Sequence, residues 1–141
     1  MKRILIALIT VVSFSAFAAP KKEIKETQPY RGVVYFNYEL SGKKIRESLH
    51  VQKDTIRVNG EEVKKANWKK GEPAMKTLLK LEKSATSKCT AGEYTLKVAK
   101  GGKKSQSEKG CVGTPRFKQL EQSFVALKDL LPKQYKKDMT P

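Results

Sequence analysis

The sequence predicts an α+β domain in which an antiparallel β-meander and a disulfide-stapled β-hairpin form one sheet, with two amphipathic helices packed on one face. Three observations favour this fold. Two-residue turn signals, Ser41-Gly42 and Asn59-Gly60, each separate segments of alternating apolar residues. A further hairpin pattern lies between two cysteines, and two segments carry apolar residues at helical spacing. The 141-residue chain carries 30 basic and 14 acidic residues, a net charge of +16, and is long enough for about one domain.

Residues 1–18 have the layout of a secretory signal peptide. Lys2 and Arg3 precede an apolar run, and Ala16-Phe17-Ala18 places small residues at positions −3 and −1 of a cleavage site before Ala19. The run is shorter than the roughly 20 residues that a membrane-spanning helix needs, although a retained anchor is the alternative. We therefore expect an exported protein, periplasmic or extracellular, with a net charge of +14 after cleavage and no second apolar run of spanning length.

The mature chain is expected to contain a disordered lead-in at 19–31, one α+β domain at 32–131 and a polar tail at 132–141. The domain begins with a meander of three or four strands. Ser41-Gly42 is expected to pair Leu40 with Lys43 in its first hairpin, and Asn59-Gly60 follows a strand at 54–58. These registers predict three apolar pairs on one face of the sheet: Tyr38 with Ile45, Val34 with Leu49, and Ile56 with Val63.

Two helices are expected on that face. Pro73, in Gly71-Glu72-Pro73, suits the first position of a helix that continues to about Lys83. Thr114 is expected to cap a second helix with Pro115 in its first turn, and Pro132 is expected to end it. The apolar stripes are Ala74, Leu78, Leu81 and Ala85 in the first helix, and Phe117, Leu120, Phe124, Leu127 and Leu131 in the second.

The second hairpin lies between the helices. Residues 93–100 alternate like a half-buried strand, and Gly101-Gly102 offers the positive φ angles of a tight turn. The return strand, 104–109, is almost wholly polar, so we expect it at the edge of the sheet, where charge prevents edge-to-edge pairing.

Cys89 and Cys111 are expected to form one disulfide at the open end of this hairpin. If Lys100 pairs with Lys103, Gly92 lies opposite Cys111 and Cys89 is close enough to be bridged. In the chain-entropy model this cross-link contributes roughly 3–4 kcal/mol. A redox or metal site is the alternative, but the spacing is not C-x-x-C and no histidine partners are present.

The most site-like stretch is Lys64-Lys65-Ala66-Asn67-Trp68-Lys69-Lys70, expected in a loop before the first helix. Its four lysines, Lys64, Lys65, Lys69 and Lys70, would neutralise phosphate or carboxylate groups, while Trp68 would stack on a ring of the ligand. The alternative interpretation is that Trp68 closes one end of the core and the lysines only solvate the loop.

The residue types of common enzymes are scarce. One histidine and two cysteines exclude most histidine-based catalysis and every multi-ligand zinc pattern. Ser41-Gly42-Lys43-Lys44 matches S-x-x-K, but it lies in a hairpin turn and lacks the companion motifs. His50 has no indicated nucleophile, and Glu61 and Glu62 point to opposite sides of a strand. We therefore expect no enzymatic activity, no cofactor and no metal.

One part of the chain resembles a known family. The C-terminal half of emfourin-type inhibitors of thermolysin-like metalloproteases is similar to Glu93-Tyr94-Thr95-Leu96-Lys97-Val98-Ala99-Lys100-Gly101-Gly102-Lys103-Lys104 and to the amphipathic helix that ends at residues 127–131. The disulfide and the basic charge depart from that family, and no inhibitory residue can be matched. The resemblance implies a small exported protein that binds a protease.

Two functions follow from these observations. The first is a non-catalytic basic binding protein whose partner is an unidentified protein, with protease inhibition as one form. The second is a cationic protein that binds an anionic cell-envelope polymer, lipid or nucleic acid through its surface lysines. Scattered lysines with only five arginines do not indicate a dedicated nucleic-acid site. The two functions differ in salt dependence, because polyanion binding weakens steeply as salt is added.

Overall fold

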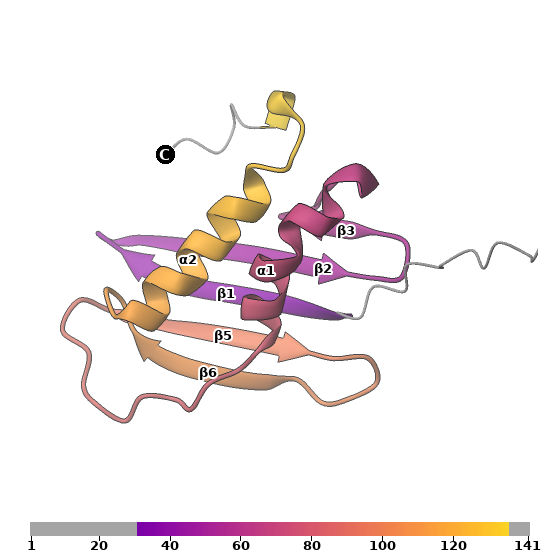
Figure 1. Ribbon diagram of the computed structural model, residues 1–141. Helices are drawn as coiled ribbons and strands as arrows, with labels where there is room; N and C mark the ends of the chain where they lie inside the picture. The colour runs from indigo at the N-terminus through magenta and orange to yellow at the C-terminus, as the bar shows by residue number, and fades with distance from the viewer. Residues whose placement is uncertain (1–30, 136–141) are drawn as a thin grey trace, which may run out of the picture.

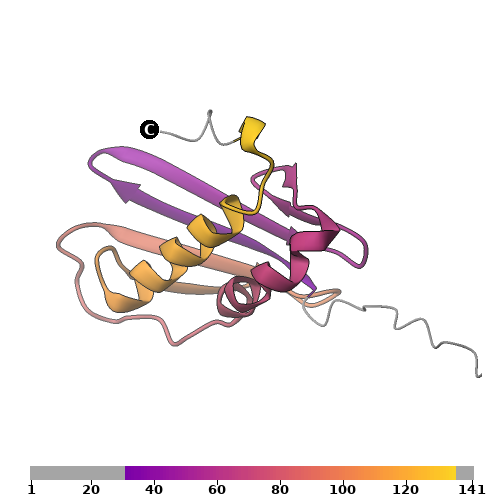
Figure 2. The same cartoon turned by 45° about the horizontal axis from the view of Figure 1, so that its top comes forward.

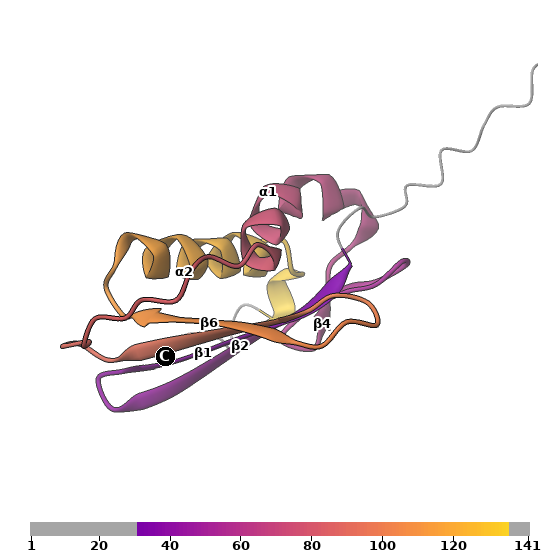
Figure 3. The ribbon, with the colours of Figure 1, turned by 90° about the horizontal axis from the view of Figure 1, so that it is seen from below.

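The structure is a computed structural model that describes residues 31–135. The expected signal peptide, nearly all of the lead-in and residues 136–141 of the expected tail lie outside the described residues. A six-stranded antiparallel sheet in the order β4-β3-β2-β1-β5-β6 carries both helices on one side (Figures 1 and 3). The predicted α+β fold is therefore confirmed. Within residues 31–135 no helix is long and apolar enough to cross a membrane.

The two predicted two-residue turns fix the meander. Ser41 and Gly42 have φ angles of 52° and 77°, and Asn59 and Gly60 have φ angles of 51° and 87°. Positive φ at both central positions matches the right-handed twist of the paired strands. The three predicted apolar pairs are confirmed: Tyr38 with Ile45, Val34 with Leu49, and Ile56 with Val63, whose N–H donates to the Ile56 carbonyl at 2.8 Å. The strands are β1 (Gly32–Leu40), β2 (Lys43–Val51), β3 (Ile56–Val58), β4 (Glu61–Glu62), β5 (Glu93–Ala99) and β6 (Gln106–Cys111).

Helix α1 spans Trp68–Leu79 and follows a short 3₁₀ turn, η1 (Lys65–Asn67), so both ends differ from the prediction. Pro73 lies inside the helix, and the helix begins earlier because Trp68 is anchored in the core. The helix ends before Lys83 because Lys80 is extended, with φ −95° and ψ 116°. The chain then turns away toward β6.

Helix α2 spans Pro115–Lys128 and begins as predicted, with the Thr114 hydroxyl accepting the Phe117 N–H at 3.3 Å. It ends before Pro132, although Leu131 beyond it is still buried. A 3₁₀ turn, η2 (Lys133–Tyr135), occupies part of the expected polar tail.

The core lies between the sheet and the two helices, which also pack against each other (Figure 2). Its centre is the Phe36 ring on β1, which stacks on Phe124 of α2 with 5.8 Å between centroids. Phe36 also contacts Tyr38, Tyr94 and Phe117 at centroid distances between 4.9 and 5.8 Å. The predicted stripe of α2 therefore faces the central strand.

The second hairpin forms, but its predicted register is wrong by one residue. Cys111 lies opposite Glu93 rather than Gly92. The Lys103 N–H donates to the Lys100 carbonyl at 2.9 Å, yet the strands resume pairing only at Gln106 with Val98. The connection thus holds one residue more than a two-residue turn requires, because Gly101-Gly102 tolerates several turn geometries. The polar return strand β6 is at the sheet edge, as predicted.

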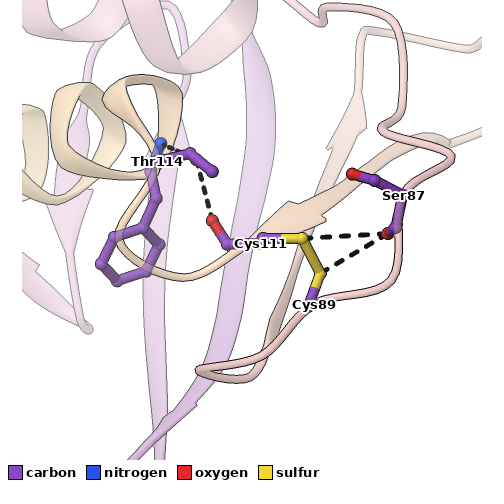
Figure 4. Close-up of a disulfide and its surroundings, with 5 residues drawn as sticks. Ser87, Cys89, Cys111 and Thr114 are labelled. Carbon is purple, nitrogen blue, oxygen red and sulfur yellow. Dashed lines mark hydrogen bonds between the residues drawn. A yellow bond between two sulfur atoms is a disulfide. The ribbon is translucent and has the colours of Figure 1, made fainter.

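The predicted disulfide is confirmed (Figure 4). Cys89 and Cys111 are bridged with their Cα atoms 5.1 Å apart, and the Ser87 carbonyl oxygen lies about 4 Å from both sulfurs. The Cys111 carbonyl accepts a hydrogen bond from the Thr114 hydroxyl at 2.8 Å. The disulfide therefore joins the segment before β5 to the last residue of β6, shortly before α2 begins.

Candidate functional site

The structure places the predicted lysine patch on η1 and the first turn of α1 instead of in a loop. All four of its lysines are exposed. Trp68 is only 6% exposed, and its Nε1–H donates to the Val63 carbonyl at 3.0 Å. Lys65 Nζ lies 5.7 Å from the centroid of the indole ring. The indole therefore closes this end of the core, and little of its surface is open to a ligand. We call Lys64, Lys65, Lys69 and Lys70 the η1 patch.

Carboxylates lie beside the η1 patch in the chain. Glu61 and Glu62 form β4 just before it, and Glu72 follows on α1, three residues after Lys69. Residues three apart are neighbours on a helix surface. In the described part of the chain, however, none of these carboxylates forms an ion pair with a lysine of the η1 patch, and Glu72 is also four residues before Lys76 on α1.

Sequence reasoning missed a buried cluster around Glu108 of β6. The Glu108 side chain is 1% exposed, and both of its oxygens are occupied. Oε1 accepts from the Tyr94 hydroxyl at 2.7 Å and from Arg116 Nε at 2.9 Å, while Oε2 accepts from Arg116 Nη2 at 3.0 Å and from the Glu82 N–H at 2.7 Å. Burial by itself raises the pKa of Glu108, but the hydrogen bonds from Arg116, Glu82 and Tyr94 together lower it below its usual value of 4.5. Glu108 is therefore an ionised structural group with no oxygen left for a substrate.

This cluster directs the chain that follows α1. Arg116 Nη2 also donates to the Lys80 carbonyl at 2.7 Å. Farther along, the Ala85 N–H donates to the Lys109 carbonyl at 2.9 Å, and the Lys109 N–H donates to the Ser84 hydroxyl at 3.0 Å. Residues 80–89 therefore run along the outer edge of β6 and end at the disulfide, as Figure 1 shows for the segment between α1 and β5.

A groove of about 570 Å³ lies where the end of α1 and the chain after it meet the β5–β6 hairpin. Its apolar residues are Leu79, Leu81 and Val98, and Gln106 is its one uncharged polar residue. Among residues 31–135, no carboxylate lines it. We call it the lysine groove, after the five lysines that surround it: Lys76, Lys80, Lys100, Lys103 and Lys104.

None of these five lysines forms an ion pair in the described part of the chain, where the recorded pairs join Arg116 to Glu82 and Glu108, and Lys128 to Glu47. Lys76 lies in the last turn of α1, and Lys80 is the first residue after that helix. Cations gathered without counter-charges produce a positive local potential that attracts anions. The groove is therefore suited to anionic groups.

The fold alone brings these lysines together. Lys103-Lys104 lies in a turn and Lys76 on a helix, far away in the sequence, so the lysines look scattered along the chain. The available signal was the spacing of Lys76 and Lys80 at the end of a helix, followed by a lysine-rich hairpin turn.

A slightly larger recess, of about 620 Å³, is lined by β1, β2 and the start of β5. It is lined by Lys44 and Arg46 but also by Glu39, Glu47 and Glu93. Its mixed charges make it a weaker anion site than the lysine groove. Among residues 31–135, no group of three histidine, cysteine or acidic residues is arranged to hold a metal ion.

Comparison of the chain with protein-family models, with curated proteins and with solved structures finds no match.

Proposed function

We propose that this protein is an exported, non-catalytic binder of an anionic polymer of the cell envelope or its surroundings, and that the lysine groove is its binding site. The observation that carries the proposal is the gathering of five lysines around one groove where, within the part of the chain that the structure describes, the lysines form no ion pair and no carboxylate lines the groove. Each lysine that contacts an anionic group of a polymer releases condensed counterions, which drives binding at low salt.

The backbone that carries the lysines is firmly held, which supports this choice of site. On one side, the Arg116–Lys80 hydrogen bond and the Glu108 cluster fix the chain after α1. On the other side, Lys100 and Lys103 close the turn of a paired hairpin. Fixed positions reduce the entropy lost on binding.

The use of lysine favours a polymer over a single recognised group. Lysine acts as a flexible point charge, whereas arginine offers a planar fork that selects one phosphate or carboxylate geometry. All five cations of the groove are lysines. A group of lysines can therefore contact the repeated charges of a polymer in more than one arrangement.

The disulfide supports the exported location, because disulfides persist in oxidising compartments outside the cytosol. The expected signal peptide at 1–18 points the same way.

Two matched variants test the proposal. The groove variant carries Lys76→Gln, Lys80→Gln, Lys103→Gln and Lys104→Gln. The control carries Lys64→Gln, Lys65→Gln, Lys69→Gln and Lys70→Gln in the η1 patch, so both lose four charges. Binding of long-chain inorganic polyphosphate is measured by fluorescence anisotropy from low to physiological salt.

We expect the groove variant to lose at least about tenfold in affinity and to reduce the slope of log affinity against log salt by about 3, since each lost phosphate contact lowers that slope by about one. The control should lose much less. Equal losses would mean that total charge, not the groove, binds the polymer. Tight capture of a protein at high salt with unchanged binding by the groove variant would favour the protein-partner interpretation instead.

A further inference from the structure

We infer that the polymer is a linear chain that passes over the turn of the β5–β6 hairpin and occupies a second cationic recess beyond it. This inference rests on the proposed function of the lysine groove. The second recess, of about 420 Å³, lies where the start of β1, the end of β2 and the hairpin turn meet. Its cations are Arg31, Lys53, Lys100 and Lys103, and no carboxylate among the described residues lines it.

The hairpin turn separates the two recesses and belongs to both. Val98 lines the lysine groove and the next residue, Ala99, lines the second recess. Val98 and Ala99 are successive residues of β5, so the two recesses meet where β5 ends and the turn begins. Lys100 and Lys103, at the turn, line both recesses and therefore join them.

Together the two recesses carry seven cations, and none of the seven forms an ion pair in the described part of the chain. A compact anion such as one phosphate can neutralise only part of this path. An unbranched polymer with a charge on each repeat can contact the groove, the turn and the second recess at once. Binding to two linked subsites raises the overall affinity by about 10² to 10⁴ without new kinds of contact.

No side chain rises from the two glycines of the turn between the recesses, and the space around them is open. A Cβ atom built on Gly101 or on Gly102 would meet no atom within 4 Å. Two residues without side chains thus leave space above the backbone, flanked by Lys100 and Lys103, through which a chain can pass. Gly102 has a φ of 73°, which disfavours other residues, whereas Gly101 does not have a positive φ and accepts a side chain.

The test compares anions of increasing length at fixed ionic strength: orthophosphate, tripolyphosphate and polyphosphate chains of several tens of units. Titration calorimetry measures the affinity per chain, which should rise with chain length. Once a chain spans both recesses, this rise should be at least about tenfold greater than the increase in the number of phosphates alone would give. Arg31→Gln with Lys53→Gln should remove this gain for long chains while sparing tripolyphosphate. The groove variant should weaken both ligands.

Blocking the turn is an independent test that leaves every charge in place. Gly101→Phe should remove most of the length-dependent gain, whereas the matched Gly101→Ala should keep it. Circular dichroism and thermal unfolding check that both variants retain the fold.

The inference fails, and the groove proposal survives, if affinity per phosphate is the same for tripolyphosphate and long chains while the groove variant weakens both. It also fails if Arg31→Gln with Lys53→Gln weakens both ligands alike. Undiminished binding of every chain length by the groove variant would overturn the proposed function together with this inference.

Discussion

The Tyr94 ring fills the space that a side chain on Gly110 would need. The two residues lie directly opposite each other on β5 and β6. A Cβ atom at position 110 would lie 2.6 Å from both Cε1 and the hydroxyl oxygen of Tyr94. Because Gly110 has no side chain, the Tyr94 hydroxyl crosses β6 and donates to Glu108. This glycine therefore permits the buried cluster that holds one side of the lysine groove.

Replacing Gly110 with alanine should displace the Tyr94 ring and weaken its hydrogen bond to Glu108. We expect the free energy of unfolding to fall by about 1–3 kcal/mol, the usual cost of overpacking a core. Urea denaturation measures the change in the free energy of unfolding. The control is Ser107→Ala, at an exposed position of the same strand, which should change this free energy by no more than about 0.5 kcal/mol. A Gly110→Ala variant as stable as the control would show that the contact is easily relieved.

The Glu108 cluster should make stability depend on pH in the acid range. Burial opposes the ionisation of Glu108, but the hydrogen bonds from Arg116, Glu82 and Tyr94 prevail, so its pKa in the folded protein is lower than the usual 4.5. The stabilisation is therefore complete above pH 4.5 and is lost as the pH falls through the lowered folded-state pKa.

Glu108→Gln tests this linkage. At pH 7 it should lower the free energy of unfolding by about 1.5–3 kcal/mol, because the partly buried Arg116 loses the charged acceptor of two hydrogen bonds and keeps only its longer ion pair with Glu82. Below pH 4.5 its stability should fall less steeply with pH than that of the original protein. Glu93→Gln, at the exposed start of β5, is the control. Parallel pH profiles for Glu108→Gln and the original protein would contradict the assigned role of Glu108.

The disulfide should hold residues 80–89 against β6. Replacing both Cys89 and Cys111 with serine should lower the free energy of unfolding by about 3 kcal/mol, from the entropy of the opened loop. The Ala85 N–H, which donates to the Lys109 carbonyl, should exchange with solvent faster, while amides of β1 should change only as far as global stability requires. Unchanged protection of Ala85 would mean that the cysteines do not hold this segment.

Trp68 provides a test of the η1 patch because it is the one tryptophan of the chain. Its burial predicts a blue-shifted emission that polyphosphate does not quench. Trp68→Phe should lower stability, since it loses the hydrogen bond to the Val63 carbonyl, but should leave polyphosphate affinity unchanged. Quenching that saturates with ligand binding would instead place the polymer on the indole.

The features that were predicted from the sequence depend on local geometry. Ser41-Gly42 and Asn59-Gly60 set their registers because two successive positive φ angles permit one tight turn. Gly101-Gly102 did not determine the register of its hairpin, because two glycines allow turns of different lengths and the hairpin adopts the longer one.

The remaining features depend on contacts between distant segments. Helix α1 begins at Trp68 because the indole is held by the core, which local helix propensity does not reveal. Glu108 is buried on a polar edge strand only because Tyr94, Arg116 and the Glu82 N–H converge on it. The lysine groove likewise combines residues from α1, the chain after it and the β5–β6 turn, so its charges appear scattered in the sequence.

The most direct test of the account is a lysine footprint. The protein is acetylated briefly with and without long-chain polyphosphate at moderate salt, and the modification of each lysine is quantified by mass spectrometry. We expect strong protection of the lysines of the groove, Lys76, Lys80, Lys100, Lys103 and Lys104, and little protection of those of the η1 patch. Uniform protection of all exposed lysines, or protection centred on the η1 patch, would contradict it.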